Sequence, residues 1–142
     1  MIRSIEELSM NAWPAMQTLH YDGWVLRYSD GYTKRANSVY PLYPSEINLD
    51  EKIEFCESFY HDRGLPAVFK LTEASTPANL DARLAERGYR KDSPTSVQTL
   101  DLRVEVSLQL SGLQFNIRCA QIFFQTVHFR CTGNRNDPWF PG

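Results

Sequence analysis

The stretch DGWVLRYSDGYTKRANSVYPLY, from Asp22 to Tyr43, is the part of the chain around which the rest can be arranged. Trp24, Leu26 and Tyr28 alternate with Val25 and Arg27, which predicts a strand. Asp30-Gly31 follows at once and suits a tight hairpin turn, because both residue types tolerate positive φ angles. A second extended run is therefore expected from Thr33 to Val39, and the two strands predict a β-hairpin.

The second run is unusual for a strand because it carries polar side chains where Val or Ile would be typical. These side chains are Lys34, Arg35, Asn37 and Ser38. One interpretation is a half-exposed antiparallel strand with a solvated face. The other is a strand that faces a ligand, in which case these four residues are candidates for substrate binding.

Length and composition predict one globular domain that lies in the cytoplasm. The chain has 142 residues, of which 42% are hydrophobic and 13% aromatic, so a sizeable core is possible and disorder is not expected. The mean hydropathy is -0.42 and no long apolar run occurs, which argues against a membrane span. The first residues lack the apolar segment of a secretory signal.

Charge and cysteine content exclude further classes. Fifteen Lys and Arg stand against seventeen Asp and Glu, and a net charge of -2 gives no basic footprint for nucleic acid. Cys56, Cys119 and Cys131 are an odd set without a CxxC motif, which fits a reducing compartment. Cys119, His128 and Cys131 lack the further ligand and spacing of a zinc site, so no metal is expected.

The N-terminal part predicts a short helix and then an ambiguous segment. Ser4 and Glu7 have the spacing of a capping box, so a helix is expected to start at Ser4, and Pro14 must end or bend it. Residues 15–21 fit a further helical turn that leads into the strand at Trp24. Two prolines make residues 41–48 a connecting loop rather than a central strand.

Two longer helices and a buried strand are expected next. Leu49, Ile53, Cys56 and Tyr60 lie on one helical face, with Asn48 as the N-cap and Gly64 as the C-terminal stop. Residues 67–71 (AVFKL) predict a short buried strand. A second helix is expected from Thr76-Pro77, with an inner face formed by Leu80 and Leu84 and an end at Gly88.

The C-terminal third is rich in β signals. Strict alternation from Leu100 to Leu110 predicts one long strand, and Ser111-Gly112 offers a turn into a hairpin return at residues 113–119. Residues 121–131 are β-prone, and residues 132–142 are turn-rich. The order of elements predicts an α+β, or mixed α/β, domain over residues 1–110 and a β-prone extension over residues 111–142.

Several words of the sequence are similar to the Gcn5-related N-acetyltransferase (GNAT) family. They are NAWPAMQTLHYDGW, GYTKRANSVYPLYP, AVFKLTEAS and LAERGYRKDSPTSVQTLDL, which together resemble the N-terminal portion of a bacterial GNAT subgroup with larger members. The resemblance covers residues 5–102. It implies a GNAT-like half-fold: a twisted, mostly antiparallel sheet with two main helices packed on it and a short N-terminal helix.

The resemblance also implies acetyl transfer from acetyl-CoA to an amine. GNAT enzymes hold the acetyl-CoA pyrophosphate on backbone amides at a helix N-terminus, through a glycine-containing loop. Residues 41–48 stand where that loop is expected, and they contain no glycine, two prolines and a carboxylate. This composition predicts a poor phosphate cradle, so binding of acetyl-CoA by this chain is not expected.

Candidate catalytic residues follow from the same resemblance. Tyr40 or Tyr43 would act as a general acid toward the departing thiolate and Glu46 as a base. Packing is nevertheless the more common role for tyrosines flanked by prolines, and a solvated carboxylate before a helix is the more common role for Glu46. Lys70 is a further candidate for a buried polar role in binding substrate, or for a side chain that reaches out to solvent.

A non-catalytic GNAT-like binding or dimerisation module is the alternative hypothesis. A half-fold leaves an edge strand that natural proteins cover by pairing, so a homodimer is expected through Leu100–Leu110 or through exchange of the segment after Gly112. The sequence beyond Leu102 departs from the resemblance. A truncated or rearranged member and a shifted reading frame are both compatible with that departure.

Overall fold

The computed structural model describes residues 1–99, 108–110, 113–115 and 123–131. It confirms the α+β class, with three helices interspersed among strands. The elements in chain order are α1 (Ile2–Ala12), β1 (Gln17–Tyr21), β2 (Trp24–Tyr28), the short 3-10 helix η1 (Lys34–Ala36), β3 (Val39–Pro41), α2 (Leu49–His61), β4 (Val68–Leu71), α3 (Leu80–Glu86), β5 (Arg90–Thr99), β6 (Leu108–Leu110), β7 (Leu113–Phe115) and β8 (Phe123–Cys131).

The main sheet has six strands in the order β1-β2-β3-β4-β8-β5. All neighbouring strands are antiparallel except β3 and β4, which are parallel and register at Val39 and Phe69. A parallel pair needs a crossover, and α2 lies in the connection between these two strands. β6 and β7 form a separate antiparallel ladder. The expected sheet, mostly antiparallel, is confirmed.

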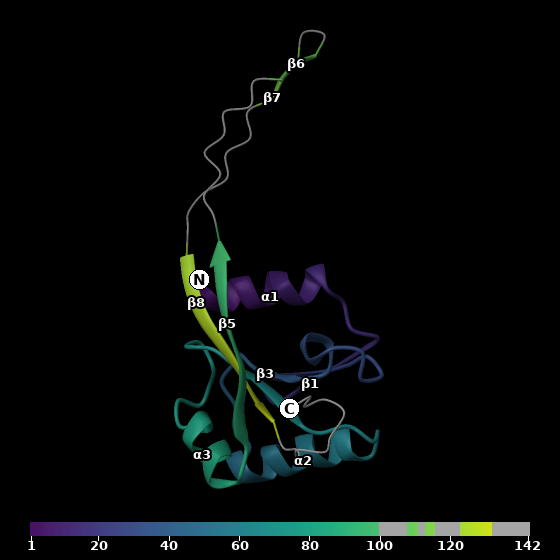
Figure 1. Cartoon of the computed structure of the whole chain (residues 1–142), viewed down its shortest axis with the longest axis vertical. Coiled ribbons are helices and arrows are strands. Elements are labelled where there is room, and N and C mark those ends of the chain that lie inside the picture. The colour runs from purple at the N-terminus through teal and green to yellow at the C-terminus, as the bar shows by residue number, and fades with distance from the viewer. Residues whose placement is uncertain (100–107, 111–112, 116–122, 132–142) are drawn as a thin grey trace.

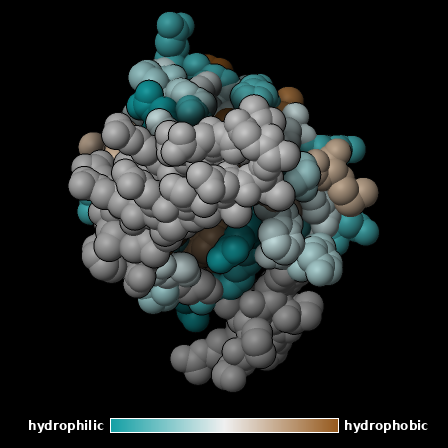
Figure 2. Space-filling model, turned by 90° about the horizontal axis from the view of Figure 1, so that it is seen from above, coloured by the Kyte–Doolittle hydropathy of each residue, from teal (hydrophilic) through white to brown (hydrophobic). Residues whose placement is uncertain are grey.

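Helices lie on both sides of this sheet, with α1 on one side and α2 and α3 on the other (Figure 1). The larger core is formed between the sheet and α2 and α3, and includes Trp24, Leu26 and Phe69 from the strands. A smaller core, with Val25, Tyr40 and Leu42, lies under α1. Seen from above in Figure 2, hydrophilic residues predominate among the described ones, as expected when the apolar residues fill these cores.

The helix α2 forms as the sequence predicts. Ile53, Cys56 and Tyr60 are fully buried on its inner face. Asn48 caps it, because its Oδ1 accepts a hydrogen bond of 2.9 Å from the N–H of Asp50. Gly64 has a φ of +67° just beyond the C-terminus. The predicted strand at residues 67–71 is also confirmed, as β4.

Two predicted helix starts are wrong. The helix α1 begins at Ile2, and its N-cap, Met1, makes no side-chain hydrogen bond, so Ser4 and Glu7 do not form a capping box. The helix α3 begins at Leu80, behind Asn79, and not at Thr76-Pro77. Its inner face is as predicted, because Leu80 and Leu84 are buried. Ser4 lies inside α1, where the backbone is already helical, whereas residues 76–79 form a bend and turn before α3 begins.

The tight β-hairpin turn is at Asp22-Gly23, not at Asp30-Gly31 as predicted. Residues 17–21 are strand β1, not a helical turn, and pair with β2 across Asp22-Gly23, whose φ angles are +41° and +81°. The strand β2 does pair with β3, but a longer loop joins them. Pro41 ends the central strand β3 and does not begin the connector.

The predicted polar strand from Thr33 to Val39 is also wrong, because residues 34–36 form η1. Asn37 explains the change. Its Oδ1 accepts hydrogen bonds from the N–H groups of Ser29 (2.7 Å) and Gly31 (3.1 Å), while its Nδ2 donates to the carbonyl of Thr33 (2.8 Å). The side chain thus supplies the hydrogen bonds that a strand partner would otherwise give, and the loop folds back on itself.

The C-terminal predictions are tested in part. Residues 100–107 of the predicted long strand lie outside the described residues, whereas Leu108–Leu110 pairs with Leu113–Phe115 as the hairpin return requires. The β-prone segment at residues 121–131 contains β8, which lies in the main sheet between β4 and β5. The division into residues 1–110 and 111–142 stays a prediction.

Candidate functional site

The first turn of α2 and the loop before it meet the β1–β2 turn. The carboxylate of Asp22 accepts hydrogen bonds from the N–H of Glu46, at 3.0 and 3.1 Å to its two oxygens, and from the N–H of Ile47 at 2.9 Å. The amide of Glu46 is the main cause of a pKa for Asp22 below its usual value, and the amide of Ile47 and Lys52 add to it. The carboxylate of Asp22 thus occupies the amides of Glu46 and Ile47.

Gly23 lets the loop approach this turn. A Cβ at this position would lie 2.2 Å from the carbonyl oxygen of Pro44 and 2.7 Å from that of Tyr43, and the φ of Gly23 is +81°. The carbonyl of Gly23 accepts a hydrogen bond of 3.0 Å from the N–H of Tyr43. Only glycine satisfies both the left-handed backbone and the close contact.

Lys52 fixes the same turn from inside the protein. Its side chain is fully buried, and its Nζ donates to the carbonyl oxygen of Asp22 at 2.5 Å and lies 3.1 Å from a carboxylate oxygen of Asp22. The ammonium also lies 4.2 Å from the ring centroid of Trp24. Burial lowers the pKa of Lys52, and the nearby Asp22 carboxylate opposes that effect without cancelling it.

Tyr43 and Glu46, two of the predicted catalytic residues, lie in this loop. The hydroxyl of Tyr43 donates a hydrogen bond of 2.5 Å to Glu7 of α1, which raises the pKa of Tyr43. Glu46 is exposed, and the contact that it makes with Asp22 is through its backbone. Tyr43 packs against the buried cluster that contains Tyr40, the third candidate, whereas the exposed Glu46 is not part of that cluster.

Tyr40 and Lys70 lie on the α1 face of the sheet, and Tyr43 packs against the same cluster as Tyr40. Tyr40 is buried and donates a hydrogen bond of 2.8 Å to the carbonyl of Arg35. Lys70 is also buried: its Nζ lies 2.5 Å from the carboxylate of Glu6 and 5.0 Å from the ring centroid of Tyr40. The side chain of Lys70 therefore does not reach out to solvent, and its role in binding substrate stays a prediction.

Arg27 is a buried charge that the sequence patterns did not single out. Its Nη1 donates to the carbonyl of Arg35 at 2.9 Å, and its Nη2 donates to the carbonyls of Met10 and Trp13. These carbonyls belong to η1 (Arg35), to α1 (Met10) and to the residue that follows α1 (Trp13), so Arg27 links β2 to both helical segments. An arginine within a strand gives no signal of such a role in the sequence.

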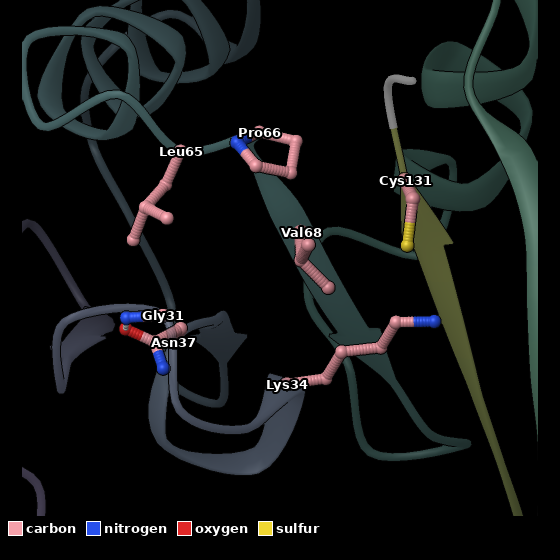
Figure 3. A pocket seen from close by; sticks show the side chains of 7 residues that line it. All are labelled: Gly31, Lys34, Asn37, Leu65, Pro66, Val68 and Cys131. Carbon is pink, nitrogen blue, oxygen red and sulfur yellow. Dashed lines mark hydrogen bonds between the residues drawn. The ribbon is translucent and has the colours of Figure 1, made fainter. Parts of the chain in front are cut away.

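The four polar residues of the predicted binding strand do not share one groove. Lys34 and Asn37 line a water-sized cavity of about 10 Å³ together with Pro66, Val68 and Cys131 (Figure 3). Lys34 pairs with Asp92. Arg35 is exposed, whereas Ser38 is fully buried and its hydroxyl has no hydrogen-bond partner within the described part of the chain. Their role in binding substrate stays a prediction.

Comparison with known families decides the relationship. Residues 1–109 match the family model described as "Probable histone acetyltransferase Rv0428c C-terminal". The chain belongs to this acetyltransferase family. The resemblance that the sequence words suggested is thereby confirmed at family level.

A similar protein is also named as an acetyltransferase. The "Uncharacterized N-acetyltransferase YobR" of Bacillus subtilis (strain 168) is 41% identical over 90 residues, which cover 63% of this chain. The match spans 35% of YobR, so the chain corresponds to about a third of that relative's length. No solved structure matches the chain.

Acetyl-CoA is the donor that an acetyltransferase family implies, and the start of α2 does not fit its pyrophosphate. Asp22 takes the amides of Glu46 and Ile47, and Asn48 takes the amide of Asp50. Pro44 has no N–H to donate. The carboxylates of Asp50 and Glu51 lie in the first helical turn and would repel a phosphate.

A second polar cluster of this acetyltransferase-family chain joins α3 to β8. Asp81 accepts a hydrogen bond of 2.6 Å from the Nε of Arg130, and its carboxylate lies 3.1 Å from the Nε2 of His128. Arg130 is the main cause of a pKa of about 2 for Asp81. Because Asp81 of α3 binds both His128 and Arg130 of β8, the cluster is best explained as a link between the helix and the sheet.

Metal sites and membrane helices were sought over the same residues. Within residues 1–99, 108–110, 113–115 and 123–131, no group of three His, Cys, Asp or Glu side chains is arranged to hold a metal ion. Cys119 lies outside those ranges, and Cys131 is buried. None of the helices in the described part is long and apolar enough to span a membrane.

Proposed function

We propose that this chain is a GNAT-like lobe of an acetyltransferase and does not hold acetyl-CoA itself. In this proposal the chain acts as part of a protein that is longer, as YobR is. That protein transfers an acetyl group from acetyl-CoA to an amine, and another part of it supplies the acetyl-CoA site. The observation that carries the proposal is the position of Asp22, whose carboxylate accepts from the amides of Glu46 and Ile47.

The physical reason is competition between two anions for the same donors. A pyrophosphate at the start of α2 needs several free backbone amides, since these give both the hydrogen bonds and the positive end of the helix dipole. Asp22 already supplies a negative charge there, and the buried Lys52 holds it in place. A nucleotide would therefore have to displace Asp22 and approach the carboxylates of Asp50 and Glu51.

Isothermal titration with acetyl-CoA tests this proposal. The chain is expected to give no saturable heat up to about 1 mM acetyl-CoA, because the phosphate donors are occupied. Coenzyme A without the acetyl group is the matched control and is expected to behave in the same way. Stoichiometric binding of either compound with a dissociation constant below about 100 μM would overturn the proposal.

Acetyl transfer by this chain itself is the second candidate function. It is favoured by membership in the acetyltransferase family. In this case Tyr40 or Tyr43 would be the acid and Glu46 the base, and the acceptor site would include Lys34, Arg35, Asn37, Ser38 and Lys70. An assay of acetyl-CoA consumption with a panel of simple amines distinguishes the two candidates.

The proposed setting is the cytoplasm, in agreement with two buried cysteines, Cys56 and Cys131, that form no disulfide with each other. A nucleic-acid partner is not proposed, because the net charge is -2.

A further inference from the structure

The two edges of the six-stranded sheet differ in how they are protected. The strand β5 forms one edge, and it carries the exposed residues Arg90, Lys91 and Pro94 as well as a shift of register between Asp92 and Thr95. Charged residues, proline and bulges are the features with which natural proteins prevent an edge strand from pairing. The edge at β5 is therefore built to stay unpaired.

The strand β1 forms the other edge and has none of these features. Its sequence is QTLHY, with no acidic residue, lysine, arginine or proline, and its pairing with β2 is continuous over all five residues. Four of its five residues are exposed. A short uncharged strand with a regular ladder is a template for a further strand.

The hydrogen-bonding groups that β1 offers can be assigned from the register. Tyr21 and Trp24 close the two-residue turn and form a hydrogen-bonded pair, and pairs alternate along an antiparallel ladder. Thr18 and His20 therefore direct their N–H and C=O groups away from β2. The N–H of Arg27, which lies opposite Thr18, points to β3 and donates to Ser38, as this alternation requires.

The side chains on both faces of β1 leave room beside the edge. Thr18 and His20 line a hollow of about 300 Å³ together with Met10, Pro14 and Val25, beside the C-terminal end of α1. On the other face Leu19 is 37% exposed, and the ring of Tyr21 stacks at 4.0 Å on Phe55 of α2, which is also 37% exposed. An added strand would cover apolar surface on one face and close the hollow on the other.

We propose that β1 pairs with β1 of a second copy of this chain, antiparallel and about a two-fold axis at Leu19. In this register Thr18 and His20 of one copy exchange backbone hydrogen bonds with His20 and Thr18 of the other. The two Leu19 side chains then face each other as a non-hydrogen-bonded pair, which brings them closest. The strand suits a copy of itself because no like charges meet across the axis. The sequence-based dimer through Leu100–Leu110 is a competing arrangement.

Charge placed at Leu19 tests this register. Leu19→Lys and Leu19→Glu are each expected to convert the dimer to a monomer, with at least a tenfold rise in the dissociation constant, because like charges lie directly opposite each other. An equimolar mixture of the two variants is expected to restore the dimer. Ser96→Lys, at an exposed position on the β5 edge, is the matched control and is expected to leave the wild-type dimer intact.

Light scattering from 5 to about 500 μM gives the masses, and circular dichroism confirms that each variant is folded. A second measurement is independent of charge: Leu19→Cys is expected to form a disulfide-linked dimer on oxidation, whereas Ser96→Cys is not. A wild-type protein that is monomeric throughout this range would overturn the proposal. So would a dimer that Leu19→Lys leaves intact.

Discussion

Two buried lysines lie on opposite faces of the sheet, and their partners differ in kind. Lys70 lies under α1 and pairs with Glu6, and both side chains are almost completely buried, with 7% and 1% exposed. Lys52 lies on the α2 face and pairs with Asp22, whose side chain is 18% exposed at the end of the β1–β2 turn. One pair is closed within the protein, whereas the other reaches the surface.

The difference indicates that the Lys70–Glu6 pair stabilises the fold, whereas the Lys52–Asp22 pair shapes the candidate site. The Lys70–Glu6 pair joins a helix to a strand that are far apart in the sequence, and both charges are compensated only if α1 is docked. The Lys52–Asp22 pair instead positions a carboxylate on the amides before α2, which is where the family resemblance led us to expect phosphate binding. In this chain the second lysine is best explained as keeping that position closed.

The largest effect is expected at Lys70. Lys70→Met leaves the Glu6 carboxylate buried without its ammonium partner and is expected to cost about 3–5 kcal/mol of unfolding free energy in urea denaturation. The double variant Glu6→Gln with Lys70→Met removes both charges and is expected to recover at least half of that loss. Equal losses in the single and double variants would show that the pair is not what joins α1 to the sheet.

Gly23→Ala, in the β1–β2 turn beside Asp22, is expected to lower the free energy of unfolding by about 2–4 kcal/mol. The cost combines a left-handed backbone with a contact to the carbonyl oxygens of Pro44 and Tyr43. Gly64→Ala is the matched control, because Gly64 also has a positive φ but a Cβ there would meet nothing within 4 Å. Thermal unfolding that gives the same loss for both variants would contradict the close approach of the loop at Gly23.

Lys52→Met is expected to cost about 1–2 kcal/mol, less than Lys70→Met, because the Asp22 carboxylate that remains can be hydrated. Methionine keeps most of the volume of the buried side chain, so the loss reports mainly on the charge. Lys91→Met, at an exposed position of β5, is the control and is expected to change stability by less than about 0.5 kcal/mol. A larger loss at Lys52 than at Lys70 would reverse the comparison.

The smallest effect is expected from the titration of Asp22. Its folded pKa lies below the unfolded value of about 3.9, so its contribution to stability is present above that value and is lost as the pH falls through the folded pKa. Wild type is therefore expected to lose more stability than Asp22→Asn between pH 5 and pH 2, and the two curves converge at the acid end. Parallel curves would show that the Asp22 charge is not stabilised by its amides.

The elements that the sequence predicted best are those with local signals. The helix α2 has its cap, its apolar face and its terminal glycine within seventeen residues, from Asn48 to Gly64. The strand β4 is a short apolar run after a proline. In both cases the residues that determine the structure are sequence neighbours, so a pattern is sufficient.

The features that the sequence did not predict depend on distant partners. Asp22 meets Glu46 and Ile47 only after β1, β2 and β3 have assembled, and Lys70 meets Glu6 across 64 positions. The loop at residues 33–38 looked like a strand because its Asn37 hydrogen bonds to the backbone do not appear in a pattern of polar and apolar residues. For the same reason the sequence identified Glu46 as the carboxylate of this region and overlooked Asp22.

An NMR titration of the amides of Glu46 and Ile47 with acetyl-CoA tests the central claim most directly. In the wild-type protein both amides are expected to exchange slowly with solvent and to keep their chemical shifts up to about 1 mM acetyl-CoA. In Asp22→Ala they are expected to exchange faster, because the acceptor has been removed. Saturable shifts of both amides in the wild-type protein at low micromolar acetyl-CoA would contradict a site closed by Asp22.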